Sequence, residues 1–531
     1  MEEEMKYLSR PKLAFFFASF ILLLGIINPL LACEICQETL QYDISKGVSQ
    51  SIHSGELLEL MKANKPLSSI IKPLTLAQQD SAQISPTPIP PKSSKTEDIN
   101  QTKLLFPTSY VKPGTKPDKK LSIEMTEGKT FLGNGVIYMG FLINGKIPGP
   151  TFTVDEGDVI EFTAVNHGSV PHGVSIHAAY TQTSKHLGKI EPGQSKTMLF
   201  RASYPGVYLY HCAPGGHAIP MHVLFGQYGM IVVKPKSHQY KMEEVLGKKP
   251  DVELYLIQHE LYANGKDAIE GKPKYTLFNG KLFRYVSDPV VAKPGDFIRI
   301  YFLNVGPNLI STLHIVGIIW DYAYWQGSPL PENTFIGGQT VLAGPSDTWI
   351  VDFRAPEDEG DYLLISHALG QTSRGAIGVL KISAEKNRTE NILADGPTYT
   401  PAEMEAYTKK AIRFISPFQP GPDEIENPWR LPNGQTNAKV EIIGNSYNPK
   451  VIEIPVGTTV EWINEDVFTF SQGEFAGIHN VMVFSGPEMF ASPMLGHAEK
   501  FSHTFTKAGE YSYLCTPHPY MRGLIKVVDR V

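Results

Sequence analysis

The sequence predicts an all-β protein whose body consists of three Greek-key β-sandwich domains in tandem. From residue 121 onward, short runs of β-branched and aromatic residues alternate with Gly and Pro turns, as in Val159-Ile-Glu-Phe-Thr and Gly229-Met-Ile-Val-Val. This alternation is typical of sandwich strands, and no long segment has helical periodicity. The length of 531 residues exceeds what one core accommodates and indicates about three domains.

One pattern of residues recurs three times in this region, which supports the repeated domains. Each copy has a glycine turn before a strand and a later strand that opens with Gly-x-Tyr, at Gly206, Gly360 and Gly509. A repeat at this spacing indicates duplicated domains rather than a solenoid. We therefore place the domains at 121–236, 237–385 and 438–531. Residues 386–437 form a linker, in which Glu403–Ile415 is predicted to be helical.

The first 32 residues are predicted to be an export signal and not part of the fold. Basic residues precede an apolar run from Leu13 to Leu31. The run ends in Leu-Leu-Ala-Cys33, which resembles a bacterial lipoprotein box and makes Cys33 a candidate for lipidation. A cleaved signal peptide, a lipid anchor and a retained membrane helix remain alternatives. Each of them places the body outside the cytoplasm, in the periplasm or an equivalent compartment.

Composition characterises the next segment and excludes one class of partner. Residues 33–120 are predicted to be a low-complexity tether, because Pro, Ser, Thr and Lys dominate much of this stretch. The formal net charge of -6 and the lack of a basic block exclude nucleic acid as a partner. Of the four cysteines, Cys212 and Cys515 lie in separate histidine-containing motifs, so we do not expect a disulfide between them.

The third domain ends in a cluster of soft metal ligands. Cys515, His518 and Met521 lie on one short loop, and His479 lies well upstream. A thiolate, two imidazoles and a weak axial thioether are the ligands of a blue-copper site. Residues 439–531 resemble plastocyanin and pseudoazurin, which are cupredoxins. The resemblance implies that these four residues bind copper and that the domain transfers electrons.

The first domain carries two histidine-containing motifs, and the second of them also contains a cysteine. His211 and Cys212 are adjacent, and neighbouring residues of a strand point to opposite faces, so they do not easily share one metal. His172 and His177 are five residues apart and should also face opposite ways. We therefore predict two metals, one held by Cys212 with His172 and the other by His211 with His177.

Residues 121–385 resemble the two-domain copper nitrite reductases. The matching stretches are Asn144-Gly-Lys-Ile-Pro-Gly-Pro, Val207-Tyr-Leu-Tyr-His-Cys-Ala-Pro and Ile365-Ser-His367-Ala-Leu. The resemblance implies a type 1 copper that passes electrons through the Cys–His peptide to a type 2 copper at a subunit interface. It also implies a homotrimer in which the type 2 ligands are His177, His211 and, from the neighbouring subunit, His367. Nitrite is the implied substrate, and an electron-donor protein is an implied partner.

The type 1 loop of the first domain departs from the family pattern. His222 followed by Gln227 matches the family's histidine and axial methionine, with glutamine in the axial place. The loop is slightly longer than in the family, and Cys212, His217 and Met221 have the spacing of azurin's ligands. We favour His222 with Gln227 and keep His217 with Met221 as the alternative.

Two catalytic positions also depart from the family. Ser175 stands where the reductases carry a proton-donating aspartate, and Ile319 where they carry a catalytic histidine. A serine is a poor general acid near neutral pH and an isoleucine cannot transfer a proton, whereas reduction of nitrite consumes protons.

The leading function is a copper-dependent, NO-forming nitrite reductase with a fused cupredoxin as electron donor, holding about three coppers per subunit. The alternatives are a non-catalytic electron-transfer or copper-binding protein, and a relative that acts on another small nitrogen or oxygen species. A laccase-type multicopper oxidase is a further alternative, although the first domain lacks the His-x-His pairs of those enzymes.

Overall fold

The structure is a computed structural model that describes residues 108–214, 218–466 and 477–529. The chain divides into two compact units, 1–101 and 102–531, and the described residues all belong to the second. The predicted signal, Cys33 and most of the predicted tether lie outside the described residues. Within the described ranges, no helix is long and apolar enough to cross a membrane.

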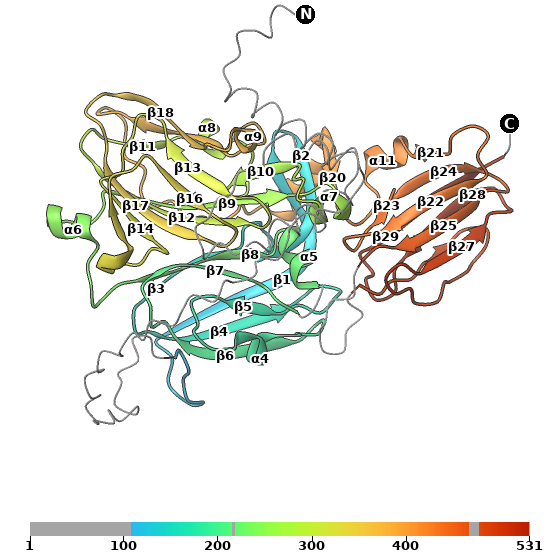
Figure 1. Cartoon of the computed structure of the whole chain (residues 1–531), viewed down its shortest axis with the longest axis horizontal. Coiled ribbons are helices and arrows are strands. Elements are labelled where there is room, and N and C mark those ends of the chain that lie inside the picture. Colours follow the sequence, from blue (N-terminus) through green and yellow to red (C-terminus); the bar gives the residue numbers. More distant parts are fainter. Residues whose placement is uncertain (1–107, 215–217, 467–476, 530–531) are drawn as a thin grey trace, which may run out of the picture. The chain divides into compact units, whose positions relative to one another are not determined.

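The first β-sandwich contains a five-stranded sheet of order β20-β2-β1-β4-β6 and a four-stranded sheet of order β3-β8-β7-β5 (Figure 1). Its elements are β1 (Lys119–Gly133), β2 (Val136–Ile143), β3 (Thr151–Asp155), β4 (Val159–Asn166), β5 (Val174–Ile176), α4 (Thr183–Leu187), β6 (Ser195–Arg201), β7 (Gly206–Cys212), α5 (Ala218–Leu224) and β8 (Tyr228–Lys234). Alternate residues of β4, such as Ile160, Phe162 and Ala164, are buried in the core between the two sheets.

The second β-sandwich pairs a six-stranded sheet, β10-β9-β12-β17-β14-β15, with a five-stranded sheet, β11-β19-β18-β13-β16. Its strands are β9 (Val252–Leu261), β10 (Tyr275–Phe278), β11 (Val290–Ala292), β12 (Phe297–Gly306), β13 (Ser311–Ile315), β14 (Tyr322–Trp325), β15 (Thr334–Ile336), β16 (Thr340–Ala343), β17 (Thr348–Arg354), β18 (Gly360–Ser366) and β19 (Ile377–Ile382). Its short helices are α6 (Lys241–Leu246), α7 (Gly265–Ile269), α8 (Arg284–Ser287), η5 (Pro331–Asn333) and α9 (Leu369–Thr372). Every residue of β12 is buried, because one face of the strand packs in this sandwich and the other packs in a core shared with the first.

The third β-sandwich pairs sheet β21-β24-β29-β28-β26 with sheet β23-β22-β25-β27. Its strands are β21 (Trp429–Arg430), β22 (Asn437–Ile442), β23 (Tyr447–Asn448), β24 (Val451–Pro455), β25 (Thr459–Asn464), β26 (Met482–Ser485), β27 (Lys500–Thr504), β28 (Gly509–Leu514) and β29 (Arg522–Val528). Trp462 lies at the centre of its core, where Phe490, Phe501, Phe505 and Tyr513 surround the indole ring. The predicted all-β fold class is confirmed.

The predicted linker, 386–437, is more ordered than its composition suggested. It contains α10 (Pro401–Lys410), β20 (Arg413–Ile415) and α11 (Pro422–Glu426). A capping box between Thr400 and Glu403 fixes the start of α10. The predicted helix extended to Ile415, but α10 ends earlier because β20 pairs in parallel with β2.

The last part of the predicted tether, 33–120, also packs on the first sandwich. Tyr110 forms an isolated bridge with Phe200, and the backbone N–H of Ser109 donates to the carbonyl oxygen of Tyr180. Strand β1 then begins at Lys119.

Candidate metal centres

The first candidate centre is a buried group of one thiol and two imidazoles. Cys212 is the last residue of β7, and its Sγ lies 3.5 Å from Nδ1 of His172 and 3.2 Å from Nδ1 of His222. His172 lies between β4 and β5 and forms a backbone bridge with Ile190, while His222 comes from α5. The three donor atoms lie within 4.8 Å of one another, which is the spacing that a single metal ion requires.

The electrostatics of this group favour a bound cation. Burial raises the pKa of the Cys212 thiol, and burial together with nearby His172 and His518 holds the pKa of His222 well below its usual value. Without a metal, the Cys212 thiol and the His222 imidazole are therefore neutral. A metal ion would stabilise the thiolate and take imidazole nitrogens as ligands, so these residues fit a thiolate-bound copper.

Two residues predicted as axial ligands of this centre can be placed. Gln227 is buried, its Nε2 donates to the carbonyl oxygen of Leu142 at 3.1 Å, and its Oε1 has no hydrogen-bond partner in the described part of the chain. A buried oxygen of this kind can serve as a metal ligand. Met221 is buried in an aromatic-rich core of which Phe141 is also a member, and the alternative ligand His217 lies outside the described residues.

His177 and His211 form the second candidate centre. Nε2 of His211 lies 3.2 Å from Nε2 of His177. Nδ1 of His211 donates to the carbonyl oxygen of Cys212 at 2.8 Å, which leaves the lone pair on Nε2. Ser175 pairs directly with His211 across β5 and β7. Cys212 and His211 thus contribute to different groups although they are adjacent in the chain.

Both imidazoles of this pair are neutral at ordinary pH. The side chain of His177 is exposed, yet desolvation by surrounding atoms and the proximity of His211 lower its pKa to about 4. Burial also lowers the pKa of His211. Neutral imidazoles with converging nitrogens are suitable ligands for a copper or zinc ion.

The third predicted ligand of this centre, His367, lies elsewhere in the chain. It follows β18, its backbone N–H donates to the carbonyl oxygen of Thr312, and its side chain is exposed. Within the described residues, no hydrogen bond or ring contact joins it to His177 or His211. Its ring instead meets the ring of His314 in an edge arrangement, with centroids 5.4 Å apart.

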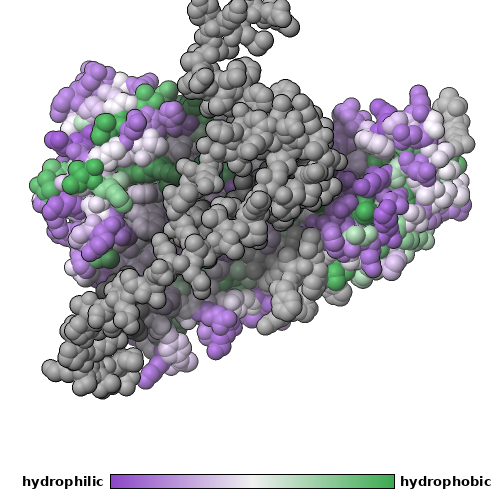
Figure 2. Space-filling model, viewed as in Figure 1, coloured by the Kyte–Doolittle hydropathy of each residue, from purple (hydrophilic) through white to green (hydrophobic). Residues whose placement is uncertain are grey.

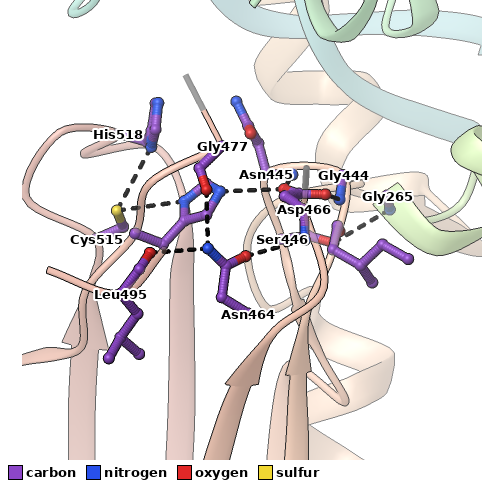
Figure 3. Close-up of polar contacts among 12 residues, drawn as sticks. Gly265, Gly444, Asn445, Ser446, Asn464, Asp466, Gly477, Leu495, Cys515 and His518 are labelled. Atoms are coloured by element: carbon purple, nitrogen blue, oxygen red, sulfur yellow. Dashed lines mark hydrogen bonds and ion pairs between the residues drawn. The ribbon is translucent and has the colours of Figure 1, made fainter. Parts of the chain in front are cut away.

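The third candidate centre lies at one end of the third sandwich. Cys515 Sγ lies 3.7 Å from Nδ1 of His479 and 3.5 Å from Nδ1 of His518. Met521 is buried on the same loop, where its N–H donates to the carbonyl oxygen of His518 and its own carbonyl accepts from Cys515. Burial alone would lower the pKa of His479, but hydrogen bonds with Asp466 and Cys515 raise it to about 9. Figure 3 shows Cys515 and His518 together with Asp466 and Asn464.

Comparison with known proteins places these centres in a family. A model of copper-binding proteins of the plastocyanin/azurin family matches residues 435–528, and a multicopper oxidase model matches residues 125–238. The copper-containing nitrite reductase of Neisseria meningitidis serogroup A is 33% identical over 285 residues, which cover 50% of this chain and 70% of that protein. The chain belongs to the copper-containing nitrite reductase family.

Other members of the copper-containing nitrite reductase family agree with this assignment. The enzyme of Alcaligenes xylosoxydans xylosoxydans is 36% identical over 300 residues, 51% of this chain and 88% of that protein. The solved Cu-containing nitrite reductase of Thermus scotoductus SA-01 is 45% identical, with a TM-score of 0.72, and the match covers 78% of this chain and all of that one. The family resemblance, the C-terminal cupredoxin domain and the expectation of copper are therefore confirmed.

In this nitrite reductase family member, aromatic rings connect the two thiol-containing centres. Phe141, on β2, stacks on His222 with centroids 4.1 Å apart. Tyr520 meets the ring of Phe141 edge-on at 5.3 Å and lies 6.1 Å from the ring of His518. Phe418, which follows β20, contacts both Phe141 and Tyr520. A continuous set of ring contacts therefore joins a candidate ligand of one centre to a candidate ligand of the other.

Sequence reasoning missed several residues that adjoin these centres. Glu127 and Asp466 contact the candidate ligands His172 and His479 from positions 45 and 13 residues away in the chain, and no local motif marks them. Phe141 carries no signal either, because a buried aromatic residue in a strand is ordinary. Tyr520 and His314 stand inside motifs that were already informative, and a closer reading of those motifs would have found them.

Proposed function

We propose that this chain reduces nitrite to nitric oxide. The observation that supports this most strongly is the division of His211 and Cys212, adjacent in the chain, between a buried thiol–imidazole group and an imidazole pair. Bound copper supplies a one-electron couple at the first and an open coordination position at the second. One peptide unit then links Cys212, in the centre that would accept the electron, to His211, in the centre where nitrite would bind.

The proposed ligand sets give about three coppers per chain. The type 1 ligands in the first sandwich are His172, Cys212, His222 and Gln227, and those in the third sandwich are His479, Cys515, His518 and Met521. The type 2 ligands are His177 and His211 together with His367 from a second copy. Among the residues that the structure describes, none partners the Oε1 of Gln227, which supports its axial role, because a copper would satisfy that buried oxygen.

A homotrimer would bring His367 to the imidazole pair of a neighbouring copy. His367 lies at the end of a sheet face that carries exposed apolar side chains, including Leu342 (58% exposed), Leu363 (42%) and Val316 (45%). The register puts these residues on one face. Thr312 and Val316 are an even number of residues apart and so point the same way. Leu342 pairs with Thr312, and Leu363 accepts the N–H of Val316 at its carbonyl oxygen. Figure 2 shows hydrophobic residues at the surface over the second sandwich. An exposed apolar face of this kind favours coverage by a second copy.

The third sandwich is proposed as the built-in electron donor. The ring contacts from His518 through Tyr520 and Phe141 to His222 support this role, since they form a continuous path of packed side chains between the two thiol-containing centres. An external donor protein would then deliver electrons to the Cys515 group.

The proposed reaction requires protons, and the two positions that supply them in the family are substituted in this chain. Each nitrite consumes one electron and two protons to give NO and water. Ser175 lies opposite His211, where its hydroxyl can orient substrate but is a poor acid. Ile319 is 68% exposed and cannot donate a proton. His314, whose ring meets His367 and whose Nδ1 donates to the carbonyl oxygen of Gln339, is the histidine best placed to compensate.

Export is proposed from the N-terminal sequence alone. The basic and apolar segments before Cys33 favour a periplasmic location, with Cys33 as the site of a lipid anchor.

The test is NO production by the copper-loaded full-length chain, supplied with nitrite and a small artificial reductant. The wild-type chain should form NO, and His211→Gln should lose this activity while the thiolate-to-copper colour remains. His186→Gln removes an exposed histidine of α4 and serves as the matched control. Absence of NO from a wild-type chain with all centres loaded would favour the alternative of a non-catalytic electron-transfer protein, in keeping with Ser175 and Ile319.

A further inference from the structure

In both thiol-containing centres, the upstream ligand histidine contacts a carboxylate through its far nitrogen. Nε2 of His172 lies 3.2 Å from Oε1 of Glu127, and Nε2 of His479 lies 3.0 Å from Oδ2 of Asp466. Both imidazoles are fully buried, and the carboxylate side chains are only 10% and 2% exposed. Because a carboxylate accepts hydrogen bonds, each Nε2 carries a proton, which leaves Nδ1, on the side of the cysteine, as the nitrogen that can bind a metal.

The two centres share the scaffold that holds these histidines. Asn166 ends β4, and its Nδ2 donates to the carbonyl oxygens of Val170 and Ile190 at 2.8 and 2.7 Å. Asn464 ends β25, and its Nδ2 donates to the carbonyl oxygens of Gly477 and Leu495, both at 2.8 Å. Ile190 and Leu495 in turn form backbone bridges with His172 and His479. The two asparagines are therefore equivalent positions of the duplicated fold.

The carboxylates, in contrast, come from different positions. The N–H that donates to the Oδ1 of each asparagine belongs to Asp466 in the third sandwich and to Gly168 in the first. A Cβ atom at Gly168 would lie 2.6 Å from Oε1 of Glu127 and 2.7 Å from Nε2 of His172. The space that an aspartate side chain occupies in one domain is thus taken in the other by a glutamate from β1. The histidine–carboxylate contact is therefore present in both domains, but residues at different positions supply the carboxylate. Duplication of one ancestral fold does not by itself explain this.

We propose that Glu127 and Asp466 are positioning residues that set the reduction potentials of the two thiol-containing centres. Each carboxylate fixes the tautomer and orientation of its histidine and increases the electron density on the ligating Nδ1. The oxidised metal carries one more positive charge than the reduced metal, so a buried negative charge nearby stabilises the oxidised state and lowers the potential. The inference rests on the proposed role of these groups as copper sites.

The two carboxylates differ in the number of other N–H groups that donate hydrogen bonds to them. Asp466 also accepts the N–H groups of Gly444 at 2.7 Å and Asn445 at 3.1 Å, as the dashed lines of Figure 3 show. From other residues in the described part of the chain, Glu127 accepts one further N–H, that of Ser169 at 2.8 Å. Because fewer N–H groups donate to Glu127, we expect Glu127 to increase the electron density on Nδ1 of His172 more than Asp466 increases that on Nδ1 of His479.

The test is a redox titration of the copper-loaded full-length chain, followed through the thiolate-to-copper absorption. A Cys515→Ser background isolates the first centre, and a Cys212→Ser background isolates the third-sandwich centre. Glu127→Gln should favour the reduced state of the first centre about tenfold, which is about 59 mV for a one-electron couple. Asp466→Asn should shift the other centre in the same direction by a smaller factor.

Matched controls remove a charge without touching a ligand histidine. Glu124→Gln lies on the same strand as Glu127, with an exposed side chain, and Glu465→Gln is adjacent to Asp466 and pairs with Lys439. Both should leave the potentials unchanged. Copper-loaded Glu127→Gln or Asp466→Asn variants whose potentials match these controls would overturn the inference. A wild-type chain that binds no copper at these groups would instead overturn the proposed function.

A second measurement on the wild-type protein covers the case in which a variant loses its copper. In the diamagnetic cuprous state, the Nε2 protons of His172 and His479 should exchange slowly with water, since each is held in a buried hydrogen bond to a carboxylate. Rapid exchange of both protons, visible in nitrogen-15 spectra of the imidazoles, would show that the carboxylate contacts do not persist and would refute the inference.

Discussion

Replacing Asn464 by alanine should loosen the segment that carries His479. The side chain is fully buried at the end of β25. Its Nδ2 donates to the carbonyl oxygens of Gly477 and Leu495 at 2.8 Å, and its Oδ1 accepts from the N–H of Asp466 at 3.0 Å (Figure 3). Alanine keeps none of these bonds and leaves their backbone partners buried without a replacement.

The three lost hydrogen bonds determine the expected magnitude. At about 1 kcal/mol each, with a further penalty for the unpaired backbone groups, the free energy of local opening should fall by about 3–4 kcal/mol. This is about a 10²- to 10³-fold increase in the opening equilibrium. The loss is smaller than the usual stability of a domain, so the third sandwich should remain folded while this end opens more often.

Hydrogen–deuterium exchange of the metal-free, full-length chain measures this opening directly. The amides of β25 and β26 should exchange faster by the stated factor, and the copper-loaded variant should lose part of the absorption due to Cys515. Asn437→Ala, at an exposed position that begins β22, is the matched control and should change neither. Unaltered exchange in Asn464→Ala would show that the carbonyl contacts do not hold the His479 segment.

Four further outcomes are expected. Cys515→Ser should remove one of two thiolate-to-copper absorption bands and lower the copper content from about three to about two per chain, which a metal assay checks against the spectrum. His367→Ala should abolish the type 2 signal in electron paramagnetic resonance and NO formation while both coloured centres persist; retention of the type 2 signal would argue against an intersubunit ligand. The folded-state pKa of His177 is lowered to about 4 from an ordinary 6.5, so the unfolded chain binds more protons between these values. The metal-free protein should therefore lose stability as the pH falls through this window, and His177→Gln should flatten the dependence of its denaturation midpoint on pH. Ser175→Asp combined with Ile319→His should raise the rate of NO formation, since an acid group contributes about 10²–10⁴ to a proton-consuming step; an unchanged rate would show that proton supply does not limit the wild-type chain.

Local rules were enough to predict the sandwich strands and the placement of His211 and Cys212 in different groups. The alternation of side chains along β7 sends His211 and Cys212 to different faces whatever the rest of the fold does. Glu127 could not be predicted in this way, because its contact with His172 depends on which strand lies beside β4 and in what register. The order of the linker escaped prediction for a similar reason. Arg413–Ile415 is too short to be recognised as a strand until β2 offers an edge.

The pairing of β20 with β2 has a consequence for reaction kinetics. Beyond β20, the buried Lys450 of the third sandwich donates to the carbonyl oxygen of Ser416, and Phe418 packs against Phe141. The segment from β20 to Phe418 is thus held by contacts with the first sandwich and with the third sandwich, and is not a flexible tether. Electron transfer from the third sandwich to the centre that contains His222 would then be first-order. Its rate would not depend on protein concentration or on solvent viscosity. A redox partner that must diffuse to its acceptor shows the opposite behaviour.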